Sequence, residues 1–330
     1  RRAEPKKAAK PGEIPRFSRR RICPPKSGVN ARHYVPLVRR ISSPWSRPSG
    51  IIGYKSAEPK KPRGIVSMER GTALVTGASA GIGEAFANLL AAEGFDLILT
   101  ARRAERLRVL SASLTERHGV KVSGIPADLA DPAGPQRLYD ELNEAGQTID
   151  LLVNNAGFGG VGRFEALDQV RQREMIDVNV SALTRLAGLM LPGMKARARG
   201  GIINVASTAA FQAGPFMAVY YASKAYVLSF SEALSEECRG TGVTVSCLCP
   251  GVTATEFFET AGFGDLPLYR LGMMDAARVA RLGYDGWRSG RAIVLPGLRN
   301  QVLVWGSRVL PRPVTRRAIR FLQEKSGAVT

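Results

Sequence analysis

The sequence predicts a doubly wound α/β domain, in which a parallel sheet of about seven strands lies between two layers of helices. From residue 72 onward, short apolar runs alternate with longer amphipathic stretches, as in sheets whose strands are joined by helices. The first runs are almost wholly apolar or β-branched, which is typical of strands covered on both faces. A glycine-rich turn directly joins the first run to the first helical stretch. The expected architecture is therefore a three-layer sandwich.

The individual elements follow from the same alternation. Strands are predicted at 72–76, 95–100, 120–125, 149–153, 201–206, 242–249 and 291–296. Helices are predicted at 81–93, 103–117, 132–146, 168–199, 216–239 and 275–288. The stretch RPVTRRAIRFLQEK (312–325) is predicted to be a short basic amphipathic helix, docked on the domain with one solvated face.

The positive charge of the chain is concentrated in residues 1–67. The formal net charge is +19, and these residues hold 11 Arg and 7 Lys against 3 Glu. They also hold 10 of the 20 prolines and lack periodicity, a composition that resists packing into a core. We therefore expect a basic, proline-rich segment at 1–67, followed by one folded domain at 68–330.

Four explanations of the basic segment stay open. Met68 is the first methionine, so the segment could be upstream sequence translated in error ahead of a natural start. The others are a disordered tail, an arginine-rich organelle presequence and a nucleic-acid-binding arm. The many prolines count against the amphipathic helix that a presequence needs.

Composition argues against several classes of site. The chain has no apolar run near the ~18 residues of a membrane-spanning helix, so we expect no membrane span. Cys23, Cys238, Cys247 and Cys249 form no CxxC pair and lie far from both histidines. We therefore expect no metal, no disulfide framework and a reducing, cytoplasmic compartment.

The run TGASAGIG (76–83) ends the first predicted strand and begins the first helix. Glycines here permit a tight turn and let the backbone approach a pyrophosphate, which then lies at the positive end of the helix. We expect this run to bind the diphosphate of a dinucleotide, with a plain glycine turn as the alternative.

The end of the second strand indicates which dinucleotide is bound. An acidic residue at this point commonly binds the ribose 2′-hydroxyl of NAD, whereas arginine accommodates the 2′-phosphate of NADP. The stretch LTARR (99–103) has no acid and contains Arg102 and Arg103. NADP(H) is therefore favoured over NAD(H), unless the two arginines merely begin the next helix.

Five motifs, in this order, resemble those of the short-chain dehydrogenase/reductase family. They are TGASAGIG, NNAG (154–157), Ser207, the pair Tyr220 and Lys224, and PGVTAT (250–255). The resemblance covers residues 70–300 and is to the single-domain branch of the family. It implies a Rossmann-type fold and an enzyme that transfers a hydride between NADP(H) and a carbonyl or alcohol.

The resemblance also implies which residues bind the cofactor, from its adenine and diphosphate to its nicotinamide ring. Ala101 stands where NAD-preferring members have aspartate, and Arg102 follows it as in NADP-preferring members. The residues that match the cofactor-binding positions of the family are Gly77, Ser79, Gly81, Ile82, Gly83, Arg102, Asp128, Leu129, Asn155, Ala156, Gly157, Tyr220, Lys224, Pro250, Gly251, Val252 and Thr253.

Four residues match the catalytic positions of the family: Asn179, Ser207, Tyr220 and Lys224. Tyr220 would exchange the proton, and Lys224, one helical turn away, would lower its pKa from ~10 toward neutrality. Ser207 would hydrogen-bond the substrate oxygen, and Asn179 would hold a water in the proton relay. Each match has a structural alternative, since serine often caps a helix and Tyr/Lys pairs are common on helices. Their joint occurrence with the glycine-rich run favours catalysis.

Family analogy places residues 207–219 and 255–273 at the border of the substrate pocket. Their apolar side chains favour a hydrophobic ketone or secondary alcohol as substrate; these are Phe211, Phe216, Met217, Phe257, Phe258 and Phe263. Glycines at 262, 264 and 272 predict a mobile lid.

Two further expectations concern partners. By analogy, 168–199 and 216–239 pair in a homo-dimer or homo-tetramer. The alternative function is a nucleic-acid- or membrane-surface-binding protein that uses the basic segment and has a non-catalytic NADP-binding fold.

Overall fold

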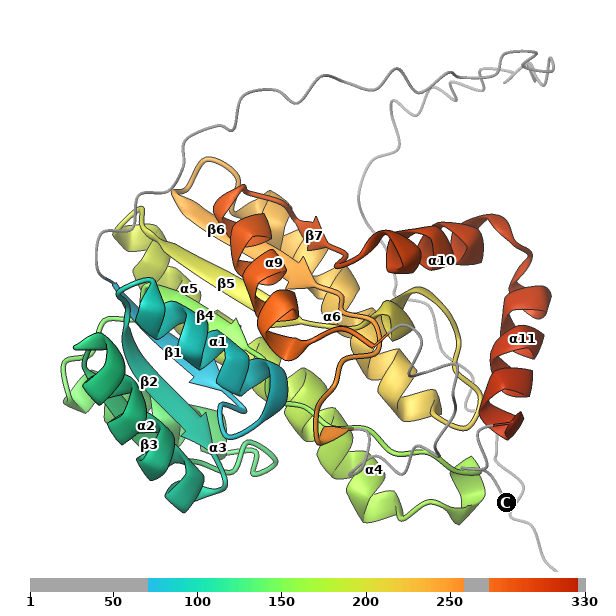
Figure 1. Cartoon of the computed structure of the whole chain (residues 1–330), viewed down its shortest axis with the longest axis horizontal. Helices are drawn as coiled ribbons and strands as arrows, with labels where there is room; N and C mark the ends of the chain where they lie inside the picture. The colour runs from blue at the N-terminus through green and yellow to red at the C-terminus, as the bar shows by residue number, and fades with distance from the viewer. Residues whose placement is uncertain (1–70, 258–272, 326–330) are drawn as a thin grey trace, which may run out of the picture. The chain divides into compact units, whose positions relative to one another are not determined.

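The described part of the protein is built on one parallel sheet. The computed structural model describes residues 71–257 and 273–325. Within these residues, seven strands pair in the order β3-β2-β1-β4-β5-β6-β7, and every neighbouring pair is parallel. Helices lie in front of and behind the sheet (Figure 1). The predicted doubly wound α/β fold is therefore confirmed.

The strands lie close to their predicted positions. They are β1 (Thr72–Thr76), β2 (Asp96–Ala101), β3 (Val122–Pro126), β4 (Leu151–Asn154), β5 (Gly200–Val205), β6 (Val243–Leu248) and β7 (Ile293–Val294). β7 is shorter than the predicted 291–296. It pairs with β6 alone at the edge of the sheet, and Pro296 has no N–H group to extend the ladder.

The helices also follow the prediction, with two differences. They are α1 (Gly81–Ala92), α2 (Ala104–His118), α3 (Gly134–Glu144), α4 (Gln169–Ile176), α5 (Leu183–Ala196), α6 (Ala218–Glu237), α9 (Ala276–Arg288), α10 (Leu298–Val309) and α11 (Arg312–Lys325). The helix predicted over 168–199 is divided by a π-helical turn, η2 (Asp177–Ala182). No helix was predicted at the position of α10, whereas α11 occupies the predicted 312–325.

Side chains that alternate along the strands fill two cores, one on each face of the sheet. On one face, Val75, Leu99 and Val153 pack with residues of α1, α2 and α9. On the other face, Leu74 and Ile98 pack with residues of α3, α5 and α6. Every residue of β4 is buried, as expected for a central strand between two helical layers.

The strand order reverses between β1 and β4, and the loops that follow these two strands meet. The backbone N–H of Asn155 donates to Thr76 Oγ1 at 2.9 Å, and Asn155 Nδ2 donates to the Thr76 carbonyl at 3.0 Å. In open α/β sheets, ligands bind at the carboxyl ends of the strands beside such a reversal. The fold therefore places a ligand crevice where the sequence places the glycine-rich run.

Several predictions fall on residues outside those described. They concern the basic segment 1–67, the pocket residues Phe258 and Phe263, and the lid glycines 262, 264 and 272. The assignment of 68–330 to a single domain also stays a prediction.

Candidate active site

The glycine-rich run forms a tight loop that leads into α1. Gly77 and Gly81 have φ angles of +65° and +58°, which favour glycine. A Cβ on Gly83 would lie 2.2 Å from the Gly77 carbonyl oxygen, so this position excludes any side chain. Ala80, which precedes α1, provides no side-chain cap. The first N–H groups of α1 are therefore available to an anion, and the loop fits the diphosphate of a dinucleotide.

A hollow beside this loop is formed by the ends of β2 and β3. It is lined by the predicted cofactor-binding residues Ser79, Arg102, Asp128, Leu129, Ala156 and Gly157, and also by Arg103 and Glu256. The structure thus brings Arg102 to the predicted place, beside Arg103 at the start of α2.

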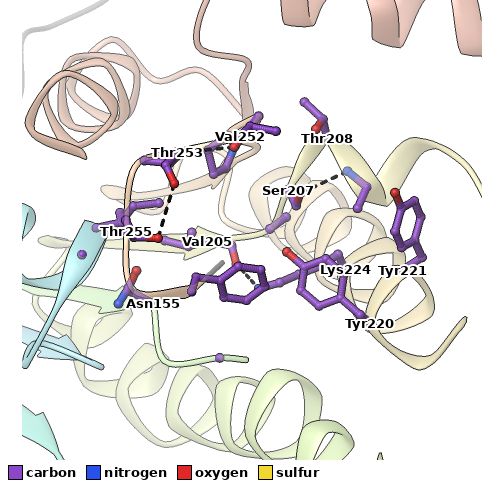
Figure 2. A pocket seen from close by; sticks show the side chains of 18 of the residues that line it. Asn155, Val205, Ser207, Thr208, Tyr220, Tyr221, Lys224, Val252, Thr253 and Thr255 are labelled. Atoms are coloured by element: carbon purple, nitrogen blue, oxygen red, sulfur yellow. Dashed lines mark hydrogen bonds between the residues drawn. The ribbon is translucent and has the colours of Figure 1, made fainter. Parts of the chain in front are cut away.

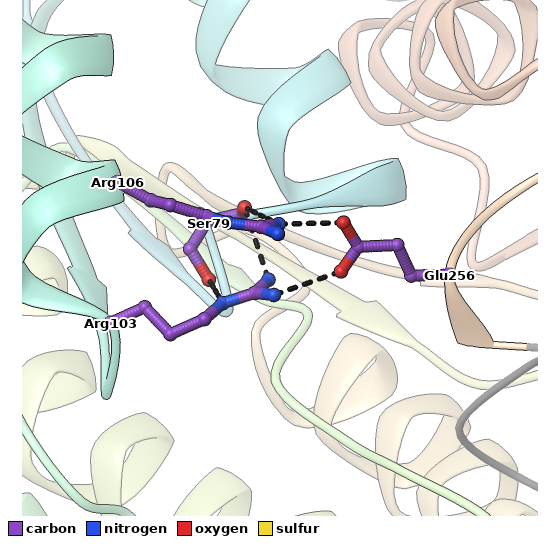
Figure 3. Close-up of polar contacts among 4 residues, drawn as sticks. All are labelled: Ser79, Arg103, Arg106 and Glu256. Atoms are coloured by element: carbon purple, nitrogen blue, oxygen red, sulfur yellow. Dashed lines mark hydrogen bonds and ion pairs between the residues drawn. The ribbon is translucent and has the colours of Figure 1, made fainter.

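Arg103, Arg106 and Glu256 form a cluster of ion pairs that sequence reasoning missed (Figure 3). Arg103 Nη1 lies 2.8 Å from Glu256 Oε2, and Arg106 Nη1 lies 2.6 Å from Glu256 Oε1. Arg103 also donates from Nε to Ser79 Oγ at 3.1 Å. Hydrogen bonds from Arg103 and Arg106 lower the pKa of Glu256. Two guanidinium groups therefore hold one carboxylate next to the glycine-rich loop.

A second, adjoining pocket brings the predicted catalytic side chains together. Figure 2 shows Ser207, Tyr220 and Lys224 around this pocket, with Tyr221 beside them. The same pocket is also lined by many of the predicted cofactor-binding residues, namely Gly77, Gly81, Ile82, Asn155, Ala156, Gly157, Pro250, Gly251, Val252 and Thr253. Gly77, Ala156 and Gly157 line both pockets, so the two form one continuous crevice.

Tyr220 lies on the first turn of α6 and is buried, with 9% of its surface exposed. Burial raises the pKa of Tyr220 to about 12, and a hydrogen bond with Ser207 opposes this rise. The expected lowering of the Tyr220 pKa by Lys224 is therefore wrong for the protein as described. The ammonium group lies 5.9 Å from the centre of the Tyr220 ring, and desolvation is the largest influence on the Tyr220 pKa. Tyr220 is thus a neutral phenol at pH 7.

Lys224 follows one turn later on α6 and is also buried. Its Nζ donates to the Val205 carbonyl at 2.9 Å, at the end of β5. Burial lowers the pKa of Lys224 to about 8, while the nearby thiols of Cys247 and Cys249 act in the opposite direction. Lys224 is therefore mostly protonated at pH 7 and loses its charge in mildly alkaline solution.

Ser207 follows β5, and its hydroxyl both caps a short helix and lies in the pocket. Its Oγ accepts a hydrogen bond from the Ala209 N–H at 3.1 Å and so caps the short 3-10 helix Thr208–Phe211 (η3). The same hydroxyl lies against Tyr220 in the pocket. The cap fixes where the hydroxyl lies, and its proton can still be donated to a substrate oxygen.

Asn179 lies in the π-helical turn η2 and is buried behind the pocket. Its Nδ2 donates to the Phe158 carbonyl and to Ser223 Oγ, both at 3.0 Å, and its Oδ1 accepts from the Phe158 N–H. Ser223 in turn donates to the Tyr220 carbonyl at 2.7 Å. Asn179 therefore links the loop after β4 to the turn of α6 that carries Tyr220. Its expected role in holding a water stays a prediction.

The outer wall of the pocket differs in part from the prediction. Met217 and Phe257 line it, and the Phe257 ring centre lies 5.5 Å from that of Tyr220. Phe211 and Phe216 do not; the Arg308 guanidinium lies over the Phe211 ring at 5.2 Å. Gln323 of α11 also lines the pocket, although no sequence pattern predicted it, and its Nε2 lies 3.6 Å from Met217 Sδ.

Two other kinds of site are absent from the described residues. Residues 71–257 and 273–325 contain no group of three or more His, Cys, Asp or Glu side chains that could hold a metal ion. In the same residues, no helix has the length and apolarity needed to cross a bilayer.

The family profile described as "short chain dehydrogenase" matches residues 71–262. The chain belongs to this family. An uncharacterized oxidoreductase from Myxococcus xanthus is 33% identical over 259 residues, which are 78% of this chain and all of that protein. The predicted family membership is therefore confirmed.

Solved structures of the family are also similar to this chain. A short-chain dehydrogenase from Sphingobium yanoikuyae in complex with NADPH is 33% identical with a TM-score of 0.65, over 72% of this chain and 93% of that one. A short-chain dehydrogenase/reductase from Burkholderia phymatum in complex with NAD is 27% identical with a TM-score of 0.64, over 72% and 92%. The family fold thus carries a nicotinamide dinucleotide, and this chain is an oxidoreductase of that family.

Proposed function

We propose that this protein is an NADP(H)-dependent enzyme that interconverts a hydrophobic ketone and its secondary alcohol, with Tyr220 as the acid and base. The observation that carries the proposal is the convergence of Ser207, Tyr220 and Lys224 on one pocket, which the glycine-rich loop also lines. The residues of this crevice fit the cofactor, and NADPH when bound would supply the hydride.

In the direction of reduction, negative charge grows on the carbonyl oxygen of the substrate and must be neutralised. Tyr220 is a neutral phenol with a pKa of about 12, so it holds the proton that this oxygen needs. Ser207 donates a hydrogen bond to the same oxygen and positions it. The proton passes from the Tyr220 hydroxyl to the substrate oxygen, and the O–H bond of the product alcohol forms.

Lys224 stabilises the tyrosinate that this transfer leaves behind. At pH 7 its ammonium group is mostly charged, since its pKa is about 8. A buried positive charge near the ring favours the tyrosinate in the low-dielectric pocket. The high pKa of Tyr220 favours carbonyl reduction over alcohol oxidation near neutral pH, because oxidation requires the phenol to lose its proton first.

The preference for NADP(H) is supported by the guanidinium groups beside the predicted 2′-phosphate position. Arg102 and Arg103 line the adenosine hollow, and Arg106 lies within reach of Ser79. No acidic side chain stands directly after β2, where it would bind a ribose 2′-hydroxyl. Guanidinium groups bind phosphate well because they present several N–H donors in one plane.

The substrate class follows from the pocket wall. Met217, Tyr221 and Phe257 present mainly apolar surface, and Gln323 adds one polar group to the pocket wall. A ketone with a bulky apolar body fits such a wall, and a polar group on that body could hydrogen-bond the Gln323 amide.

The test is consumption of NADPH and of NADH across a panel of ketones and aldehydes, together with direct measurement of dinucleotide binding. We expect reduction of hydrophobic ketones, with a higher kcat/KM for NADPH than for NADH. Tight NADPH binding with no turnover of any carbonyl or alcohol would contradict the proposal and favour a non-catalytic dinucleotide-binding protein.

A further inference from the structure

The two C-terminal helices expose apolar side chains in a helical stripe on the solvent side. On α10, Leu298, Val302, Trp305 and Val309 follow the i, i+4, i+7, i+11 spacing of one helix face. Their exposed fractions are 76%, 60%, 68% and 63%. In a water-soluble helix such a stripe normally faces the core, whereas the buried residue of α10 is Val304, on another face.

The next helix, α11, repeats this arrangement. Val314 and Phe321 are seven residues apart, on the same helix face, and are 49% and 55% exposed. The body-facing side of α11 carries Gln323, which is buried. Both helices therefore have one side packed on the domain and an apolar stripe left in solvent. We name α10, α11 and these stripes the C-terminal apolar surface.

This surface is also strongly basic. Residues 298–325 contain seven basic side chains and one acidic one, Glu324, which pairs with Arg320 at 2.8 Å. Arg317 and Arg320 of α11 are exposed and lie, by helical spacing, between its apolar stripe and its buried side. A helix with an exposed apolar stripe bordered by arginines is typical of peptides that lie in the interface of an anionic bilayer.

We propose that the C-terminal apolar surface docks this protein on the surface of a membrane that contains anionic phospholipids. The apolar stripes would enter the boundary between headgroups and acyl chains, and the arginines would contact the headgroup phosphates. The positive charge of this surface, together with its apolar stripe, favours an anionic membrane over the other possible partners. A second copy would bring seven basic groups against seven, and a nucleic acid would leave the stripe of Val302, Trp305 and Val309 unused.

The position of the helices connects this surface to the proposed active site. Figure 1 shows α10 beside β7, at the edge of the sheet, and α11 following it at the right of the view. Arg308 of α10 packs on Phe211 of η3, the turn that Ser207 caps. Gln323 of α11 lines the pocket of Tyr220. Docking would therefore bring the pocket close to the bilayer, although the docking proposal itself does not depend on the reaction.

Trp305 provides a direct readout in the full chain, using vesicles of phosphatidylcholine with and without phosphatidylglycerol. We expect phosphatidylglycerol vesicles to shift Trp305 emission to the blue, and lipids brominated on the acyl chains to quench it. The chain's other tryptophans are Trp45 and the buried Trp287, so Trp305→Phe identifies the responding residue by removing both signals. A shift that persists in Trp305→Phe would contradict the proposal, because another segment would then be responsible.

Vesicle flotation of matched variants completes the test. The double variant Val302→Ser/Trp305→Ser should bind roughly tenfold or more weakly, because two membrane-inserted apolar groups are lost. Val109→Ser is the control, since Val109 is 55% exposed on α2, away from this surface. NADPH binding by each variant confirms its fold.

Equal flotation of parent and double variant, as when the basic segment 1–67 alone binds the lipid, would overturn the proposal. Sedimentation velocity without lipid gives a second check. If the double variant sedimented as a smaller particle than the parent, the stripe would be a contact between copies, and the proposal would be overturned.

Discussion

Arg103 and Glu256 form an ion pair with a 2.8 Å contact that joins the start of α2 to the segment after β6. Arg106 binds the other carboxylate oxygen of Glu256, so both guanidinium groups are held by one carboxylate. A 2′-phosphate offers the same kind of acceptor, with more negative charge. In the proposed NADP(H) complex, Glu256 would therefore compete with the 2′-phosphate for the two arginines.

This competition predicts opposite effects for the two partners of the pair. Glu256→Gln should tighten NADPH binding, whereas Arg103→Ala should weaken it by roughly tenfold, the size of a lost hydrogen bond to a charged group. NADH binding should change little in either variant, because NADH lacks the 2′-phosphate. Fluorescence titration with both dinucleotides measures these affinities. Equal losses of NADPH and NADH affinity in Arg103→Ala would assign the arginine a purely structural role.

Lys224 predicts a pH dependence of the reduction. Because burial lowers its pKa to about 8, the lysine is charged below this pH and neutral above it. We expect kcat/KM for ketone reduction to fall as the pH rises through about 8, as the tyrosinate left by proton transfer loses its positive neighbour. The measurement is the pH profile of the parent and of Lys224→Arg, in which the descending limb should move to higher pH. The exposed Lys121 is the control, and Lys121→Met should leave the profile unchanged.

Gly83 predicts a steric effect on cofactor binding. A Cβ at this position would lie 2.2 Å from the Gly77 carbonyl oxygen, so the loop must shift in Gly83→Ala. Overpacking costs about 1–3 kcal/mol, and a cost of this size in the cofactor-binding loop should lower NADPH affinity by a factor of roughly 5–150. Gly188, in the interior of α5, is the control position for the same substitution, because a Cβ there would meet nothing within 4 Å. Gly188→Ala should raise the free energy of unfolding by about 0.5–1 kcal/mol and leave NADPH binding unchanged.

Gln323 predicts an effect on substrate choice. Since its amide lines the pocket, Gln323→Leu should lower kcat/KM for ketones with a distant hydroxyl or carbonyl group, by roughly tenfold relative to hydrocarbon ketones. Gln301→Leu, on the exposed side of α10, is the control and should not alter this ratio. A uniform loss across all substrates would indicate that Gln323 only supports the fold.

The fold could be predicted because its determinants are local in the sequence. The apolar runs that become β1, β2 and β4 are buried on both faces, and TGASAGIG carries its own requirement for glycine at 77, 81 and 83. The site residues that were predicted share this property, since each belongs to a short motif at the end of a strand or on one helix turn.

The features of the site that could not be predicted depend on contacts between distant parts of the chain. Glu256 is 153 residues from Arg103, and Gln323 is 106 residues from Met217, so no local pattern reveals either contact. The direction of the Tyr220 pKa shift was predicted wrongly for a related reason. Spacing shows that Lys224 is one turn away, but only the three-dimensional structure shows how strongly burial opposes ionisation. The predicted oligomer and compartment stay predictions.

The central claim is that Tyr220, and not its neighbour, exchanges the proton. The direct measurement compares the parent with Tyr220→Phe and Tyr221→Phe, following NADPH consumption with a hydrophobic ketone and measuring NADPH binding in parallel. Both tyrosines line the pocket, with ring centres 6.1 Å apart, so each variant removes one hydroxyl from the same pocket. We predict that Tyr220→Phe lowers kcat by a factor of about 10²–10⁴ while NADPH still binds, and that Tyr221→Phe keeps turnover near that of the parent. Turnover by Tyr220→Phe equal to that of the parent would contradict the account.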